Sequence, residues 1–185
     1  MTFRVPFVNP GKQYQRLKQE LDAAYADVME HGDLIDRRHL REFEEQLAGF
    51  VGTRYAVGLN SGYDALHLSL RAAGIGPGDE VIVPAHPFVA TASAVVNAGA
   101  TPVLVDVAGD FNIDVSKIEA ALTPRTKVLL PVHLNGQMAA MPAIMEIAQR
   151  YGLAVIEDAC QSLGASIDRR KAGAWGLTGC WSFYP

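Results

Sequence analysis

VIVP at residues 81–84 is the first of four short apolar runs that decide the fold. PVLVDV at 102–107, KVLLPV at 127–132 and LAVIED at 153–158 follow it. Each run is mostly apolar instead of alternating with polar residues, which is typical of strands buried on both faces of a parallel sheet. Segments with helical spacing of apolar residues lie between the runs. This alternation predicts a doubly wound α/β domain, with a mainly parallel sheet and flanking helices.

Turn residues and apolar periodicity place the boundaries of the expected elements. Tyr55–Leu59 is interpreted as a further strand, followed by a turn at Asn60-Ser61-Gly62. Residues 1–50 form an N-terminal helical segment and residues 51–185 an α/β domain. An apolar strand at Gly179–Pro185 runs to the last residue, so we expect the domain to be incomplete at the C-terminus. The expected helices are 13–31, 39–50, 64–73, 88–97, 114–122 and 142–151, and the other expected strands are 80–83, 101–105, 127–132 and 153–157.

Composition and charge argue against several classes of protein. Hydrophobic residues make up 49% of the 185 residues and charged residues 19%, which suits a globular domain with a core. A net charge of −4 and the lack of a basic stripe argue against nucleic acid as a partner. No apolar run reaches the roughly 18 residues of a membrane span. The two cysteines lack metal spacing and predict neither a disulfide framework nor a zinc site, so we expect a cytoplasmic protein.

Ligands in open α/β sheets bind at the carboxyl ends of the strands, so the residues after each strand are the candidate site. The turn at Gly62 and Tyr63 begins a helix, whose first N–H groups suit a phosphate or simply form a tight turn. Asp158 ends a strand, where its carboxylate either caps the next segment or keeps a pyridine nitrogen protonated by raising the pKa of that nitrogen. Gln161 could then reach the phenolic oxygen of the ring. Phe88 is either a core residue or an aromatic that stacks on the ring.

Other polar residues carry weaker signals. His86 and His133 follow different strands with no third ligand in view, which favours structural hydrogen bonding over a metal site. Ser61 and Ser162 have no histidine at the spacing of a serine hydrolase. The basic cluster Arg169-Arg170-Lys171 is interpreted as a solvated turn.

Several longer motifs carry a resemblance to a known family. They are VGLNSGYDALHLSLRAAGIGPGDEVIVPAHPFVATASAVVNAGATPVLVDV, NIDVSKIEAALTPRTKVLLPVHLNGQ, IEDACQSLGA and GCWSFYP. Together with the opening PFVNPGKQY, they cover nearly the whole chain. The sequence resembles the DegT/DnrJ/EryC1/StrS family of nucleotide-sugar aminotransferases, which use pyridoxal 5′-phosphate (PLP). The resemblance implies the large domain of the fold type I PLP-dependent transferases.

The resemblance also implies a role for individual residues. The Schiff-base lysine of the family follows a phosphate-contacting serine by five positions. This lysine would stand at position 187, beyond Pro185, so no catalytic residue is expected within the chain. Cofactor contacts are implied for Gly62 and Tyr63 in the phosphate turn, Phe88 on the pyridine ring, Asp158 at the ring nitrogen, Gln161 beside the ring hydroxyl and Ser182 at the phosphate.

The activity that the resemblance implies is a transamination. The complete protein, as a homodimer, would transfer an amino group from an amino acid such as glutamate to a ketosugar carried on a nucleotide. A small C-terminal domain is expected to be absent from the 185 residues, so the chain alone is expected to be inactive. Relatives with histidine in place of the lysine act as sugar dehydratases, and the residue at position 187 would distinguish this alternative. The other alternative is a non-catalytic fragment or a regulatory relative.

Some positions depart from the family pattern. Tyr63 stands where threonine is usual, and its phenol is too long to donate to a phosphate from the same position. Pro87 precedes the stacking aromatic where Thr or Ser is usual, and proline has no N–H to donate. Asn135 and Met138 replace a tyrosine and a proline. These changes affect the expected choice of substrate more than the fold.

Overall fold

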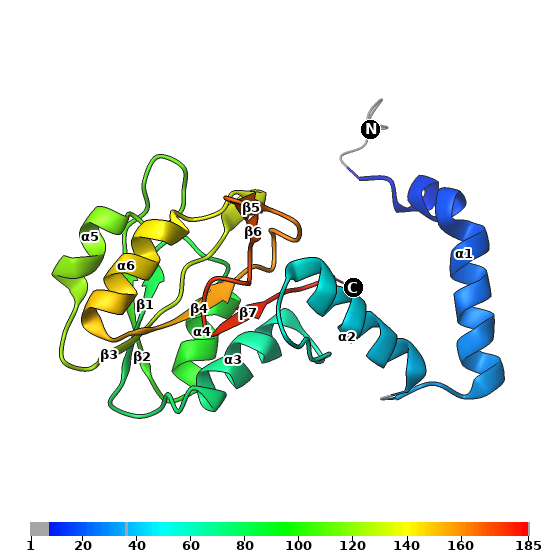
Figure 1. The fold of residues 1–185 in the computed structure, drawn as a ribbon, viewed down its shortest axis with the longest axis horizontal. Helices are drawn as coiled ribbons and strands as arrows, with labels where there is room; N and C mark the ends of the chain where they lie inside the picture. Colours follow the sequence, from blue (N-terminus) through cyan, green and yellow to red (C-terminus); the bar gives the residue numbers. More distant parts are fainter. Residues whose placement is uncertain (1–7, 36, 185) are drawn as a thin grey trace, which may run out of the picture. The chain divides into compact units, whose positions relative to one another are not determined.

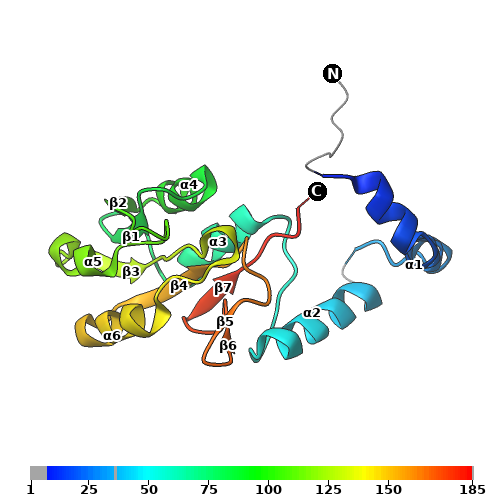
Figure 2. The ribbon, with the colours of Figure 1, turned by 90° about the horizontal axis from the view of Figure 1, so that it is seen from above.

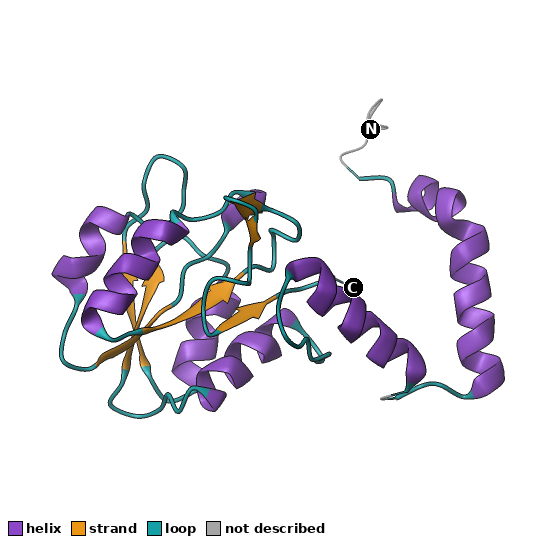
Figure 3. Cartoon of the chain, viewed as in Figure 1, coloured by secondary structure: helices purple, strands orange, loops and turns teal. Residues whose placement is uncertain are grey.

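The computed structural model describes residues 8–35 and 37–184, and the chain divides into the compact units Met1–Gln46 and Leu47–Pro185. Figures 1 and 3 show the elements of each unit. No helix in the described part of the chain is long and apolar enough to cross a lipid bilayer. The helices are α1 (Pro10–His31), α2 (Arg38–Val51), α3 (Gly62–Ala72), α4 (Val89–Asn97), α5 (Val115–Ala121), η1 (Leu134–Gly136) and α6 (Met141–Tyr151). The strands are β1 (Glu80–Pro84), β2 (Thr101–Val105), β3 (Thr126–Leu129), β4 (Ala154–Asp158), β5 (Ser166–Ile167), β6 (Arg170–Lys171) and β7 (Thr178–Cys180).

The first unit consists of α1 and most of α2. Asn9 caps α1 by accepting a hydrogen bond from the Lys12 N–H at 3.0 Å, and Gly32 ends the helix in the left-handed conformation. Asp27, near the end of α1, forms an ion pair with Arg38 at the start of α2, with an N–O distance of 2.5 Å. Helical spacing therefore predicted both helices correctly.

The second unit is built on a parallel five-stranded sheet with the strand order β2-β1-β3-β4-β7. The mainly parallel sheet expected from the continuous apolar runs is confirmed. A separate antiparallel hairpin joins β5 to β6. Asp168 and Arg169 form its turn with positive φ angles, so the basic cluster does lie at a turn.

Helices cover both faces of the sheet, with α3 and α4 on one face and α5 and α6 on the other (Figure 2). In the central strands β1, β3 and β4, successive residues enter different cores. Val81 and Val83 of β1 belong to the same core as Leu66 of α3, whereas Ile82 belongs to the core that contains Ile144 of α6. Because both faces are covered, the strands are apolar at almost every position.

The strand expected at Tyr55–Leu59 is wrong. This segment has no regular secondary structure, and Tyr55 and Val57 are 71% and 74% exposed. A strand needs a neighbour whose N–H and C=O groups complete its hydrogen bonds. No strand in the described residues pairs with this segment. The strand expected from Gly179 onward is also shorter, because β7 ends at Cys180.

A buried carboxylate joins two segments at the amino edge of the sheet. Glu80, at the start of β1, accepts hydrogen bonds from the Thr123 hydroxyl and from the guanidinium of Arg125, whose Nε lies 2.9 Å from Oε1. The Thr123 hydroxyl and then Arg125 hold the pKa of Glu80 below its ordinary value.

Acidification is expected to destabilise the chain through Glu80. Because its folded pKa lies below its unfolded pKa, Glu80 stabilises the folded state above the unfolded pKa, and this contribution is lost as the pH falls through the folded pKa. Glu80→Gln should therefore lower the free energy of unfolding at about pH 7 but much less at about pH 3. Urea denaturation at the two pH values measures this difference. An equal loss at both values would contradict the role of the ionised carboxylate.

Candidate functional site

The carboxyl ends of β4 and β7 meet the first turns of α3 and α4. Asp158, the last residue of β4, is paired with Cys180, the last residue of β7. The carboxylate of Asp158 is hydrogen-bonded to Thr91 in the first turn of α4. Gly62, the first residue of α3, packs against Ser182 just after β7. The topology therefore brings segments from four elements together at one edge of the sheet.

Asp158 is held in a fixed orientation by two donors. Its Oδ2 accepts a hydrogen bond from the Thr91 hydroxyl at 2.7 Å, and its Oδ1 accepts one from the Cys160 N–H at 3.2 Å. Only 4% of the residue is exposed, and a buried carboxylate requires such partners. Each carboxylate oxygen has a second lone pair, so Asp158 can accept one more hydrogen bond from a ligand. Thr91 had no sequence signal, because its role depends on how α4 packs against β4.

Gly62 lies where no larger residue fits without movement. A Cβ at this position would lie 2.8 Å from Cys160 Sγ, 2.9 Å from Ser182 Cβ and 3.3 Å from the Trp181 carbonyl oxygen. Ser182 Oγ accepts a hydrogen bond from the Tyr184 N–H at 3.4 Å, so its own O–H can still donate. The absence of a side chain at position 62 therefore lets the start of α3 reach the segment after β7.

The first turn of α3 directs backbone N–H groups toward the same edge. Ser61 caps the helix by accepting a hydrogen bond from the Asp64 N–H at 3.1 Å. The N–H groups of Gly62 and Tyr63 precede this bond, in the part of the turn for which a helix has no carbonyl partner. The phenol of Tyr63 accepts a hydrogen bond from Asn97 at the far end of α4. Tyr63 can thus contribute its N–H to an anion, while its side chain is engaged elsewhere.

Phe88 immediately precedes α4. The Thr91 N–H donates to the Phe88 carbonyl at 3.0 Å, which places Phe88 one helical turn from the partner of Asp158. Phe88 is 65% exposed. The interpretation of Phe88 as a core residue is therefore wrong, and its ring has a free face on which a flat ligand could stack.

Gln161 lies in the loop after β4 and is oriented by a neighbouring loop. Its Oε1 accepts a hydrogen bond from the Asn135 N–H at 2.8 Å, and Asn135 has a positive φ of 54° inside η1. An amide whose oxygen is engaged in this way presents its NH₂ group as the donor. Within the described residues, no hydrogen bond joins Gln161 to Asp158.

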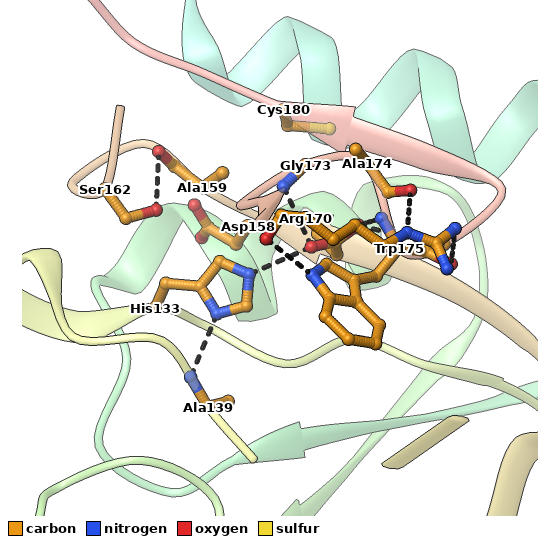
Figure 4. A network of polar contacts seen from close by, with 12 residues as sticks. His133, Ala139, Asp158, Ala159, Ser162, Arg170, Gly173, Ala174, Trp175 and Cys180 are labelled. Carbon is orange, nitrogen blue, oxygen red and sulfur yellow. Dashed lines mark hydrogen bonds and ion pairs between the residues drawn. The ribbon is translucent and has the colours of Figure 1, made fainter. Parts of the chain in front are cut away.

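The second carboxylate of β4, Glu157, points to the opposite face of the sheet from Asp158, because successive side chains of a strand alternate. Glu157 is completely buried, and its Oε2 lies 3.0 Å from His133 Nε2. Figure 4 shows the polar network around His133 and the loop of Gly173–Trp175. In the sequence the two carboxylates stand side by side at the end of LAVIED, and their different environments arise only from the sheet.

The two histidines that the sequence places after strands have different surroundings. His133 is buried, and its Nδ1 accepts a hydrogen bond from the Ala139 N–H at 3.1 Å, so the expected structural role is confirmed. His86 packs its ring against Phe111, with ring centroids 6.0 Å apart. Among the described residues, no group of three His, Cys, Asp or Glu residues could hold a metal ion.

The two cysteines are packing residues in this structure. The Cys160 thiol donates to the Cys180 carbonyl oxygen, with an S–O distance of 3.7 Å. Burial raises the pKa of both thiols, that of Cys180 to about 12. Both thiols therefore remain protonated near neutral pH, which argues against a nucleophilic role.

The fold and the site together define an α/β protein with a candidate binding site at the carboxyl edge of its sheet. The site offers backbone N–H groups and a hydroxyl that can donate hydrogen bonds, a fixed carboxylate that can accept one, and an exposed aromatic ring. The chain belongs to the DegT/DnrJ/EryC1/StrS aminotransferase family, which matches residues 15–185. Over 185 residues it is 48% identical to the "dTDP-3-amino-3,4,6-trideoxy-alpha-D-glucose transaminase" of Streptomyces venezuelae, covering 100% of this chain and 49% of that protein.

Solved structures show the same relationship. The structure of S. venezuelae DesV "in complex with ketimine intermediate" has a TM-score of 0.96 and 48% identity, and the match covers 100% of this chain and 50% of that one. NtdA of Bacillus subtilis "with bound cofactor pmp" has a TM-score of 0.84 and 39% identity, over 94% of this chain and 40% of that one. The chain thus has the fold of these proteins and spans about half the length of the relatives that it matches.

Proposed function

We propose that this chain is the cofactor-binding part of a PLP-dependent aminotransferase. Its substrate would be a ketosugar carried on a nucleotide, and its amino donor an amino acid such as glutamate. The observation that carries the proposal is the convergence of the Gly62 turn, Ser182, Asp158 and Phe88 on one edge of the sheet. PLP has a phosphate, a ring nitrogen and a flat aromatic face, and the edge offers a counterpart for each.

The phosphate would bind at the start of α3. The N–H groups of Gly62 and Tyr63 and the hydroxyl of Ser182 would donate hydrogen bonds to its oxygens. The positive end of the α3 dipole adds to the attraction for an anion. With Tyr63 in place of threonine, the site loses only the threonine hydroxyl, because the N–H of residue 63 remains in the turn.

The ring would bind between Phe88 and the end of β4. Asp158, held by Thr91 and Cys160, would accept a hydrogen bond from the ring nitrogen and keep it protonated. When bound in this state, the cofactor supplies an electron sink for chemistry at an amino-acid carbon. Gln161 would direct its NH₂ group to the phenolic oxygen, since its carbonyl oxygen is bonded to the Asn135 N–H.

Residues 1–185 are expected to bind PLP without catalysing amino transfer. The lysine that the family resemblance places at position 187 is not part of this sequence. We also propose that the complete protein acts as a homodimer, as the resemblance implies. Amino transfer from glutamate to a nucleotide ketosugar by residues 1–185 alone would contradict this part of the proposal.

PLP binding by the chain is the direct test of the site. A titration should give a saturable circular dichroism signal in the cofactor absorption band, because an achiral cofactor becomes optically active in an asymmetric site. Pyridoxal, which lacks the phosphate, should bind about tenfold more weakly or worse. Asp158→Asn should also weaken PLP binding by about tenfold, and Thr91→Val, which removes only the orienting hydrogen bond, by less. Equal affinities for PLP and pyridoxal, or no saturable signal, would refute the proposed function.

A further inference from the structure

We propose that Glu157 is a positioning residue that fixes two loops of the candidate site relative to β4, from the opposite face of the sheet. The loops are 133–139 and 173–177, the second of which leads into β7. As far as it concerns the cofactor, this inference rests on the proposed function. In the described part of the chain, the side chain of Glu157 forms no hydrogen bond with a residue proposed to bind PLP, so its effect would pass through the backbone.

The carboxylate of Glu157 accepts hydrogen bonds from donors in two loops. Its Oε2 accepts the Gly173 N–H at 2.8 Å and lies 3.0 Å from His133 Nε2. Its Oε1 accepts the N–H groups of Trp175 at 2.6 Å and Gly176 at 2.8 Å. Within the described residues, no lysine or arginine forms an ion pair with it. Hydrogen bonds from neutral donors therefore satisfy this fully buried group.

The surroundings of His133 determine which of its nitrogens carries the proton. Nδ1 accepts the Ala139 N–H at 3.1 Å, so it must be unprotonated. The proton is then on Nε2, whose N–H donates a hydrogen bond to the carboxylate of Glu157. Through these two hydrogen bonds, His133 connects Glu157 of β4 to the backbone at Ala139 (Figure 4).

Each loop that Glu157 holds leads to a residue of the candidate site. The loop through Gly173 continues into β7 and on to Ser182, which contacts Gly62. The loop after His133 contains Asn135, whose N–H orients Gln161. Asp158 follows Glu157 directly in the chain. One buried carboxylate therefore supports the phosphate, ring-nitrogen and ring-hydroxyl contacts together.

The network requires a carboxylate and not merely a polar residue of the same shape. Four donors converge on two oxygens, and an ionised carboxylate has lone pairs for all four. In Glu157→Gln, the amide NH₂ group would face two of these donors whichever way the amide is turned. A shift of the His133 proton to Nδ1 would not relieve this, because Nδ1–H would then face the Ala139 N–H.

The test is amide hydrogen exchange of the 185-residue chain, together with PLP titration. In Glu157→Gln, segments 133–139 and 173–180 should both exchange about tenfold faster than in the wild type, and PLP should bind about tenfold more weakly. The matched control is Glu80→Gln, which makes the same chemical change at the other edge of the sheet. Relative to the rest of the α/β unit, both segments should exchange at the wild-type rate in this control, and its PLP affinity should be unchanged under conditions in which both variants are folded.

The outcomes separate this inference from the proposed function. Unchanged exchange in either segment of Glu157→Gln, or faster exchange with unaltered PLP affinity, would overturn the positioning role. If the wild type does not bind PLP, the proposed function fails, and the exchange data alone decide whether Glu157 holds the loops. If Glu157→Gln does not fold, His133→Leu decides instead. It removes one donor and should loosen 133–139 while 173–180 stays protected, and loosening of both segments or of neither would overturn the inference.

Discussion

Replacing Gly179 with alanine is expected to lower the free energy of unfolding by about 3 kcal/mol or more. Gly179 lies in β7 opposite Glu157, and a Cβ at this position would lie 2.3 Å from Gly173 Cα and 2.4 Å from the Gly173 carbonyl oxygen. These are backbone atoms, which cannot move aside as the end of a flexible side chain can. The clash must therefore separate β7 from the loop before it.

Urea denaturation followed by far-ultraviolet circular dichroism measures this loss from the shift in midpoint at constant slope. Gly109→Ala is the matched control, because no described heavy atom outside Gly109 and its two chain neighbours lies within 4 Å of the position that its Cβ would take. Its stability should stay within about 0.5 kcal/mol of the wild type. A midpoint for Gly179→Ala equal to that of the control would show that the packing of β7 is looser than the structure indicates.

Gly62→Ala is expected to have the largest effect on cofactor binding, with an affinity for PLP about a hundredfold lower. The added methyl group would lie 2.8 Å from Cys160 Sγ and 2.9 Å from Ser182 Cβ. The start of α3 must then withdraw from the segment after β7, which separates the N–H donors from the Ser182 hydroxyl. Losing two charge-assisted hydrogen bonds to a phosphate corresponds to about this factor.

The loss should be specific for the phosphate. Pyridoxal, which lacks that group, should bind Gly62→Ala and the wild type with similar affinity in the same titration. Gly76→Ala serves as the control, since the added Cβ would make only an ordinary contact, 3.9 Å from the Ala98 carbonyl oxygen. Gly76 lies in the turn before β1, away from the start of α3. If Gly62→Ala weakens PLP and pyridoxal equally, the start of α3 is not the phosphate site.

Continuous apolar runs were enough to predict the sheet, because strands buried on both faces have little choice of residue type. The same rule failed at Tyr55–Leu59, where the run is apolar but no described strand lies beside it. The local sequence indicates how hydrophobic a segment is and which backbone conformations it favours. Whether a segment becomes a strand also depends on hydrogen-bonding partners that are distant in the chain.

In the candidate site, too, the sequence indicated some residues, and only the structure showed their partners. Strand-tip position and family resemblance named Asp158 and Gln161, and the structure shows how each is oriented. The residues that orient them, Thr91 for Asp158 and the backbone of Asn135 for Gln161, lie 67 and 26 positions away in the chain. Such pairings depend on how helices and loops pack, for which a single sequence has no periodic signal.

The sequence by itself determined the fold class and the family, and it predicted the carboxyl edge of the sheet as the place of the candidate site. These follow from periodicity, from turn residues and from motifs that are contiguous in the chain. Only the tertiary structure showed that Gly62 packs against Ser182, and that Glu157 and Asp158, adjacent in sequence, serve opposite faces of β4. The physical reason is that close packing and the satisfaction of buried polar groups are properties of residues brought together by folding, and chain order does not encode them locally.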